Sequence, residues 1–385
     1  MTTRRTMLGA LAGAALLPTA AFAAAPAGSE EALKDIAKRK GLRFGTAVGS
    51  GKNQFGDPAY RALVERECGI IVAENEMKWQ ALEPRRDAAN FAPADAMLAW
   101  ANEKGMAMRG HNLFWQAEKW LPAWVAQEQF GAKPAQGAER LMRKHVQTVC
   151  GHFGKAIGGW DVVNEAIDPA DGKLRQNALT RAFAGGSTPA AGALDQIDLA
   201  FRLAKEYAPH AQLVYNDYMR GDLGSTRHRA GVLEMLAALK KRGTPVDALG
   251  LQSHIGSWDE SADRGKADLL EWRHFLDQVT GMGYDLLITE FDVNDRRLPA
   301  DIAKRDAGVA AAARDYLDLT LSYPGLRDFL LWGMADHINW LQTWDEAPRT
   351  DKLAMRPCPY DAQLRAKPLR QAMADAMRAM PARRA

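Results

Sequence analysis

Trp160-Asp161-Val162-Val163-Asn164-Glu165 is a short, mostly apolar run that ends in two polar side chains. Leu286-Leu287-Ile288-Thr289-Glu290-Phe291-Asp292 repeats this pattern further along the chain. Runs with so little alternation are typical of strands buried on both faces of a parallel sheet. The C-terminal ends of such strands are where a β/α barrel carries its active site. The two stretches therefore predict that Glu165 and Glu290 lie at one mouth of a barrel.

The rest of the chain alternates similar runs with amphipathic stretches. Eight apolar runs occur, at residues 42–48, 69–73, 106–114, 157–163, 211–215, 248–252, 285–289 and 328–333. The helices predicted between and after them span residues 57–66, 94–104, 137–153, 194–208, 229–242, 267–280, 305–322 and 367–380. No linker rich in proline and glycine divides the chain, although longer insertions follow the fourth run (167–193) and the eighth (343–360). This order predicts the α/β class and a single (β/α)8 TIM barrel over residues 26–385.

The first residues have the composition of an export signal. Arg4 and Arg5 precede a small-residue apolar run, and Ala21-Phe22-Ala23 is an Ala-x-Ala cleavage site. A charged start, an apolar centre and small residues at the cut define a secretory signal, and paired arginines favour the twin-arginine route. An ordinary secretory signal with a chance arginine pair is the alternative. We expect residues 1–25 to be a twin-arginine-type signal peptide and the protein to be exported, to the periplasm or to the medium.

Charge and cysteine usage narrow the classes of partner. The formal net charge is +3 and the basic residues are scattered, which argues against nucleic-acid binding. No run after the signal is long and apolar enough to span a membrane. Cys68, Cys150 and Cys358 lack the spacing of a zinc site. A protein folded before export needs no disulfides, so three free thiols are expected, with a Cys68–Cys150 bond left open. We expect no metal and no cofactor, and we take the protein to be a monomer.

Two glutamates at different strand ends provide what glycoside hydrolysis needs. One protonates the leaving oxygen, and the other attacks the sugar or activates water. Retaining enzymes hold the two carboxyl groups about 5–5.5 Å apart and inverting enzymes about 6.5–9.5 Å apart, a choice that the sequence leaves open. His254, at the end of the sixth run, could hydrogen-bond Glu290 and keep it ionised, with Asp292 orienting the imidazole. A satisfied histidine at the barrel rim is the alternative.

Polar and aromatic motifs follow most of the predicted strands. In chain order they are Glu74-Asn75-Glu76-Met77-Lys78-Trp79, Arg109-Gly110-His111, Trp160 to Glu165, Tyr215-Asn216-Asp217-Tyr218, Leu251 to His254, Ile288 to Asp292, Leu331-Trp332-Gly333 and Asn339-Trp340. Each motif is weak by itself, and together they are highly specific. Over nearly the whole mature chain they resemble glycoside hydrolase family 10 endo-β-1,4-xylanases.

The resemblance implies a role for each of these residues. Glu165 would be the general acid/base and Glu290 the nucleophile in a retaining hydrolysis of xylan or xylo-oligosaccharides. Asn164 would bind the 2-hydroxyl of the sugar under attack, in a contact that strengthens in the transition state. His254 and Asp292 would orient the nucleophile. The other substrate-binding residues implied by the resemblance are Glu74, Asn75, Lys78, His111, Trp115, Tyr218, Gln252, Trp332 and Trp340, together with His254 itself.

One loop departs from the family pattern. After Phe114-Trp115 the family continues with His and, two positions later, with a Gln that contacts sugar. Here these places hold Gln116 and Glu118, and Glu118-Lys119-Trp120 lengthens the loop. We therefore expect the subsites on the non-reducing side to differ in their preference for chain length or for decorated xylan.

Two other functions compete with this interpretation. A related barrel glycosidase would act on another β-glycan, such as cellulose or an aryl glycoside. The pocket around Lys78, Trp332 and Trp340 would decide this, because xylose lacks the hydroxymethyl group that a glucan enzyme must accommodate. A non-catalytic sugar-binding barrel would be expected to lack Glu165 or Glu290, and both are present.

Overall fold

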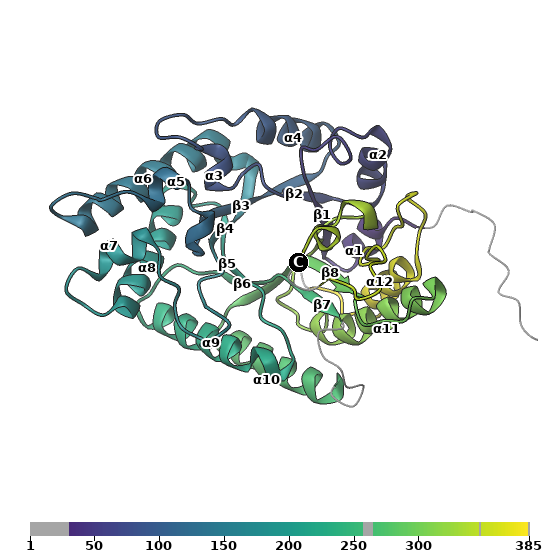
Figure 1. Cartoon of the computed structure of the whole chain (residues 1–385). Coiled ribbons are helices and arrows are strands. Elements are labelled where there is room, and N and C mark those ends of the chain that lie inside the picture. Colours follow the sequence, from purple (N-terminus) through teal and green to yellow (C-terminus); the bar gives the residue numbers. More distant parts are fainter. Residues whose placement is uncertain (1–30, 257–264, 346–347, 384–385) are drawn as a thin grey trace, which may run out of the picture. The chain divides into compact units, whose positions relative to one another are not determined.

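The computed structural model describes residues 31–256, 265–345 and 348–383. Eight parallel strands close into a barrel, and helices surround it, as the view along the barrel in Figure 1 shows. The predicted α/β class and the single (β/α)8 barrel are thus confirmed. The signal peptide expected at residues 1–25 lies outside the described residues.

All eight predicted strands are present, and their order closes the barrel. The order is β1-β2-β3-β4-β5-β6-β8-β9, and β9 pairs with β1. The short β7 follows β6 and pairs with β8. The bounds are β1 (Arg43–Val48), β2 (Ile70–Ala73), β3 (Ala107–Trp115), β4 (Ile157–Asn164), β5 (Gln212–Asp217), β6 (Ala248–Leu251), β7 (His254–Gly256), β8 (Asp285–Asn294) and β9 (Asp328–Leu331).

The predicted helices are also found, and sequence signals explain how some of them begin. Asp57 caps α2 by accepting a hydrogen bond from the backbone N–H of Ala59 at 2.9 Å, and Pro58 occupies the first turn. Two helices of seven residues, α1 and α7, were not predicted; α7 lies in the insertion after β4. The bounds are α1 (Leu33–Arg39), α2 (Pro58–Glu67), α3 (Trp79–Leu82), α4 (Ala92–Glu103), α5 (Ala123–Ala126), α6 (Pro134–Phe153), α7 (Ala178–Ala184), α8 (Pro189–Tyr207), α9 (Thr226–Lys241), α10 (Gly265–Gly281), α11 (Ile302–Thr320) and α12 (Pro368–Ala379).

Strand β8 is longer than predicted and carries the nucleophile candidate in its interior. It runs to Asn294, beyond the expected end at Thr289. Beyond Thr289, polar residues alternate with Phe291 and Val293, which are both buried in the core. The prediction relied on continuous apolar residues, so it ended at Thr289 and did not include this half of the strand. The extension pairs with β7, which places His254 in register with Asp292.

A line of ion pairs runs from the exposed Arg43 into the barrel interior, below the active-site mouth. Asp328, the first residue of β9, accepts hydrogen bonds from Arg43 at 2.6 Å and 2.7 Å and from Arg109 at 3.3 Å. Arg109 also donates to Asp161 at 2.6 Å, and Asp161 bonds His111 Nδ1 at 2.9 Å. Buried charges remain stable when each has opposite charges and hydrogen bonds around it. This line therefore sets the orientation of His111 from beneath.

The structure decides the state of the three cysteines, which the sequence left open. Cys68, Cys150 and Cys358 are all buried free thiols, so Cys68 and Cys150 are not bonded to each other. Across the described ranges, no helix has the length and apolar character needed to cross a bilayer.

Candidate active site

The two predicted carboxylates meet at the C-terminal mouth of the barrel, joined by a chain of hydrogen bonds. Gln252 Nε2 donates to Glu165 Oε1 at 3.1 Å and to Asn164 Oδ1 at 3.3 Å. Asn216 Nδ2 donates to the same Asn164 oxygen at 2.9 Å and to Glu290 Oε1 at 2.7 Å. Strands β4, β5, β6 and β8 thus contribute to one polar cluster, as the sequence predicted for their C-terminal ends.

A glycine allows Asn216 to reach Glu290 across an intervening strand. Asn216 lies on β5 and Glu290 on β8, with β6 between them. A Cβ atom on Gly250, which is paired with Asn216, would lie 2.4 Å from Asn216 Oδ1. Thr289 Oγ1 donates to that oxygen at 2.7 Å, which turns the amide nitrogen toward the carboxylate. Sequence analysis gave Asn216 no role, although its motif at a strand end was an available signal.

Glu290 is buried and held as an anion. His254 Nε2 donates to Glu290 Oε2 at 3.3 Å, and Nδ1 donates to Asp292 Oδ1 at 3.0 Å. Burial opposes the charge on this imidazole, but the two carboxylates prevail and raise the pKa of His254 to about 10. Burial also acts to raise the pKa of Glu290. The hydrogen bond from His254, the charge of His111 and further contacts outweigh it and leave the pKa of Glu290 below its usual value.

Asp292 is itself fixed from the β9 side of the barrel. Trp340 Nε1 donates to Asp292 Oδ2 at 2.7 Å, and Asn339 Nδ2 donates to the same oxygen at 3.1 Å. The Trp340 ring also meets His254 edge-on, with ring centroids 5.0 Å apart. The predicted contacts among Asp292, His254 and Glu290 are therefore present. They are held by Trp340, which sequence analysis expected only as a substrate-binding residue.

The surroundings of Glu165 differ from those of Glu290. Its side chain is partly exposed, and its backbone φ of 55° lies in the left-handed region, which is uncommon for a residue with a side chain. Trp115 Nε1 donates to Glu165 Oε2 at 2.8 Å. Burial raises the pKa of Glu165, and the charges of Asp217 and Glu290 act in the same direction. The hydrogen bonds from Gln252 and Trp115 offset this only in part, so Glu165 is the carboxyl that stays protonated more readily.

Asp217 is a buried acid at the end of β5 for which sequence analysis gave no role. It accepts hydrogen bonds from the hydroxyl of Tyr215 and, at 2.7 Å, from the backbone N–H of Tyr218. His228 Nε2 lies 3.0 Å from its Oδ1. These contacts fix the carboxylate whose charge helps to raise the pKa of Glu165. Its place in the motif on the fifth strand was the only signal available.

Lys78 brings a buried ammonium group to the side of the cleft formed by β2. Its Nζ donates to Asn75 Oδ1 at 3.0 Å and lies 4.7 Å from the ring centroid of Trp115 and 5.9 Å from that of Trp332. Burial lowers the pKa of Lys78, whereas the charges of Glu290, Glu74 and Glu165 act against that effect. The amine is thus a hydrogen-bond donor placed among three carboxylates.

Glu74 and the aromatic wall complete this side. Gln54 Nε2 donates to Glu74 Oε2 at 2.8 Å, and burial raises the pKa of Glu74. Trp332 is buried and meets His111 edge-on at 5.2 Å between ring centroids. The structure therefore gathers Glu74, Lys78, His111 and Trp332 around the carboxylates, while Asn75 is exposed at the rim.

Tyr218 and an unpredicted arginine lie on the other side of Glu165. Arg175, from the insertion after β4, donates through Nη2 to the Tyr218 hydroxyl at 2.9 Å and through Nη1 to Asp168 at 3.2 Å. Its charge and that of Glu165 attract each other. No motif pointed to Arg175, because its position depends on how the insertion folds back toward β5.

Gln116 and Glu118, which were expected to change the subsites on the non-reducing side, bond to residues of the insertion after β4 and of α8. Gln116 is buried; its Nε2 donates to Gln196 at 3.0 Å, and its side-chain oxygen accepts from Asn177 at 2.9 Å. Glu118 forms an ion pair with Arg181 on α7. The two residues therefore attach the loop after β3 to the insertion after β4.

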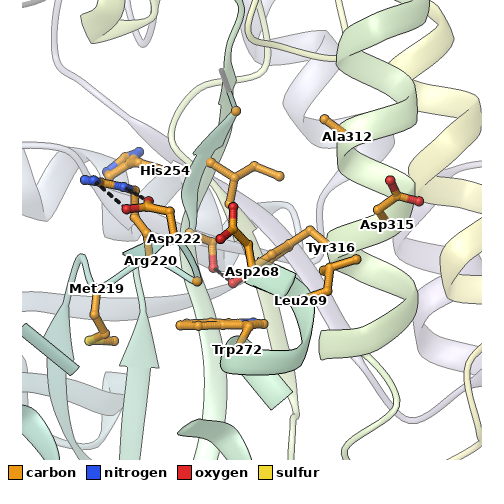
Figure 2. Close-up of a pocket in the computed structure, with 14 residues that line it drawn as sticks. Met219, Arg220, Asp222, His254, Asp268, Leu269, Trp272, Ala312, Asp315 and Tyr316 are labelled. Carbon is orange, nitrogen blue, oxygen red and sulfur yellow. Dashed lines mark hydrogen bonds and ion pairs between the residues drawn. The ribbon is translucent and has the colours of Figure 1, made fainter. Parts of the chain in front are cut away.

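A cavity of roughly 220 Å³ adjoins the side of the cleft that carries Glu290, and His254 borders both. It is bordered by the loop after β5, by β7, by α10 and by α11. Figure 2 shows the Trp272 indole at one end, and Arg220 bonded to Asp222 at the side of the cavity.

In the described part of the chain, no group of three or more His, Cys, Asp or Glu side chains is arranged to hold a metal ion.

Comparison with known proteins places this site in a family. A match to glycosyl hydrolase family 10 covers residues 32–376. Endo-1,4-beta-xylanase 1 of Humicola insolens is 31% identical over 331 residues, which are 85% of this chain and 70% of that protein. The chain therefore belongs to glycosyl hydrolase family 10 and is a glycoside hydrolase.

Solved structures of xylanases have the same fold as this chain. Native xylanase 10B from Thermotoga maritima superposes with a TM-score of 0.77 at 27% identity, covering 90% of this chain and 98% of that one. Xylanase 10B from Thermotoga petrophila, solved in complex with xylobiose, gives a TM-score of 0.77 at 26% identity, covering 91% and 98%.

Proposed function

We propose that this protein is an endo-1,4-β-xylanase that hydrolyses internal bonds of xylan and xylo-oligosaccharides with retention of configuration. The observation that carries the proposal is the contrast between two carboxyl groups in one hydrogen-bonded cluster. The pKa of Glu165 is raised and the pKa of Glu290 is lowered. An acid and a nucleophile that work together at one bond need this difference. The names of the similar proteins support xylan as the substrate.

The mechanism follows from these two states in two steps. In the first, Glu290 attacks the anomeric carbon and forms a glycosyl ester, while Glu165 gives its proton to the leaving glycosidic oxygen. Esterification removes the charge of Glu290, and this lowers the pKa of the now ionised Glu165. In the second step Glu165 takes a proton from water, the water oxygen attacks the anomeric carbon, and the ester bond to Glu290 breaks. Both carboxyl groups then return to their starting states.

The surrounding side chains are proposed to hold the sugars on either side of the broken bond. Asn164 binds the 2-hydroxyl of the sugar under attack, while His254 and Asp292 orient the nucleophile. The partners of Asn164 support this role. Its oxygen accepts from the amides of Asn216 and Gln252, and its own Nδ2 donates to Glu165 Oε1 at 3.3 Å. A primary amide has two N–H groups, so the second can donate to a sugar hydroxyl. The substrate-binding set proposed is Glu74, Asn75, Lys78, His111, Trp115, Tyr218, Gln252, His254, Trp332 and Trp340.

The experiment that tests this proposal compares two hexasaccharides. The protein is incubated with xylohexaose and with cellohexaose, and proton NMR follows the products and their anomeric configuration. The expected result is early release of β-anomers from xylohexaose and no cleavage of the glucan. Cleavage of cellohexaose instead would replace the substrate and keep the two-glutamate chemistry, whereas α-anomers first would exclude retention. No cleavage of either would favour a sugar-binding barrel.

We also propose that residues 1–25 direct export of the protein, to the periplasm or the medium, by the twin-arginine route. The support is the sequence alone, with Arg4-Arg5 ahead of an apolar stretch. Replacing both arginines by lysine keeps the charge, so it tests the pair itself. Loss of activity from the exported fraction, with accumulation of the longer chain inside the cell, is expected. Unchanged export would indicate an ordinary secretory signal.

A further inference from the structure

Four side chains form a continuous stack from the cleft to the protein surface. Lys78 Nζ lies 4.7 Å from the ring centroid of Trp115, and the rings of Trp115 and Trp120 stack with centroids 4.7 Å apart and planes 17° apart. Lys119 Nζ lies 5.2 Å from the centroid of Trp120. Stacked rings and cations over ring faces attract each other. The Trp120 ring therefore has neighbours on its faces, and it is not an open platform for a sugar although it is 38% exposed.

The turn that carries Trp120 is anchored at two points. This turn is a short 3-10 helix, η1 (Glu118–Trp120), in the loop after β3. Glu118 pairs with Arg181 on α7. Asn177, the residue that caps α7, donates through Nδ2 to the backbone oxygen of Gln116 at 3.0 Å. The turn and the short helix thus support each other, and Trp120 is held where it meets Trp115.

The inner end of the stack is at the acid/base. Trp115 Nε1 donates to Glu165 Oε2 at 2.8 Å, and that hydrogen bond requires the indole plane to keep its present orientation. We propose that Trp120 is a positioning residue, which fixes the Trp115 indole and through it the proton-donating carboxyl of Glu165. The inference rests on the proposed function in naming Glu165 as the acid/base.

The reason is geometric. Without Trp120, one face of the Trp115 ring would meet water, and the indole could rotate away from Glu165. Proton transfer is sensitive to displacement of the donor, and loss of general acid catalysis costs about 10²–10⁴ in rate when it is complete. A partial loss of position should cost less. The loss should also depend on the leaving group, because a good leaving group departs with little help from a proton.

The test compares wild-type protein with Trp120→Ala and Trp120→Phe on two substrates. One is xylohexaose, and the other is 2,4-dinitrophenyl β-xylobioside, whose leaving group is acidic. The kcat/KM value is compared, because it reports the steps up to formation of the glycosyl ester. Trp120→Ala should lower kcat/KM for xylohexaose about tenfold and change the aryl substrate less than about twofold. Trp120→Phe keeps a ring on Trp115 and should restore most of the activity.

The pH profile gives a second readout. The hydrogen bond from Trp115 lowers the pKa of Glu165. Loosening it should therefore move the alkaline limb of the kcat/KM profile for xylohexaose to higher pH in Trp120→Ala. Arg181→Gln removes the ion pair that holds the turn to α7. It should lower kcat/KM for xylohexaose and shift the alkaline limb in the same directions, by smaller amounts. This variant provides the test if Trp120→Ala does not fold. Ile302→Ala removes another exposed apolar side chain, at the start of α11, and should leave both substrates unchanged.

The outcomes separate this inference from the proposed function. Equal losses on both substrates with an unmoved pH profile would overturn the positioning role and indicate a structural or binding one. Unchanged activity on xylohexaose in Trp120→Ala would overturn it as well. In either case, cleavage of xylohexaose by the wild-type protein would leave the proposed function standing.

Discussion

The two walls of the cleft hold their carboxyl groups by different means. Glu290 lies inside β8, is 5% exposed, and receives hydrogen bonds from Asn216 and His254, which stand on strands β5 and β7. Glu165 follows the last residue of β4, is partly exposed, and its neighbour Trp115 is supported by loops. Burial acts to raise the pKa of both. Because burial acts in the same direction on both, the hydrogen-bonding and charged partners decide which carboxyl has a raised pKa and which a lowered one.

The largest effect on the rate is expected when either carboxyl group is removed, and the products should show which role each one has. Glu290→Ala and Glu165→Ala should each lower kcat on xylohexaose by at least about a thousandfold, which corresponds to roughly 4 kcal/mol of transition-state stabilisation. Azide should then distinguish them, because it can enter the space that each variant opens. With 2,4-dinitrophenyl β-xylobioside, Glu290→Ala should form the α-azide by direct attack, and Glu165→Ala should form the β-azide from the glycosyl ester.

The control for these variants is the isosteric exchange of each carboxylate by an amide. Glu290→Gln and Glu165→Gln keep the volume and exclude azide, so both should stay inactive without rescue. Azide products of the reverse configuration, identified by proton NMR, would exchange the roles of the two residues.

A smaller effect is expected from the residue that crosses β6. Asn216→Ala removes a hydrogen bond to a charged group, worth about 1.5–3 kcal/mol, and should lower kcat/KM about tenfold to a hundredfold. Since that bond lowers the pKa of Glu290, the acidic limb of the profile should move to higher pH. Gly250→Ala should act in the same direction by displacing Asn216. In contrast, Gly158→Ala on β4 meets open space and should be neutral. An unmoved acidic limb in both variants would contradict the role of Asn216.

The next prediction concerns stability rather than rate. The pKa of His254 is raised to about 10 in the folded protein, whereas an unfolded histidine titrates near about 6.5. Its charge therefore stabilises the fold fully below about pH 6.5, and this contribution is lost as pH rises through about 10. The difference in Tm between wild type and His254→Gln should be largest at pH 6 and should narrow toward pH 10. The exposed His274→Gln serves as control. A constant difference for His254→Gln across this range would contradict the prediction.

The smallest predicted effect concerns the pKa of Glu165 alone. The charge of Asp217 raises the pKa of Glu165, so Asp217→Asn should move the alkaline limb of kcat/KM to lower pH. The shift should be less than about one unit, which is about 1.4 kcal/mol. The acidic limb, which reports Glu290, should not move. Movement of both limbs together would show that the two carboxyl groups do not titrate as separately as their different partners suggest.

Much of the fold was readable from the sequence because buried parallel strands leave continuous apolar runs. All eight strands were found in this way, and Asp57-Pro58 correctly marked the start of α2. The second half of β8 was missed because it carries Glu290 and Asp292. These polar residues belong to the active-site cluster and interrupt the apolar run that marks a buried strand. Helix α7 was missed because it is short and its stability depends on Asn177 and on contacts with the loop after β3.

The barrel could be predicted from its apolar runs, and the two glutamates from their positions at the ends of two of these runs. The sugar-site candidates came from the resemblance of the motifs to a known family. The hydrogen bonds and ring contacts that join these residues became visible only in the folded chain. The bond from Asn216 to Glu290 needs Gly250 on the strand between them, and the support of Glu165 by Trp115 includes Trp120 on a turn held by α7. Such contacts depend on strand register and on the folding of insertions, which bring together residues that are far apart in the chain.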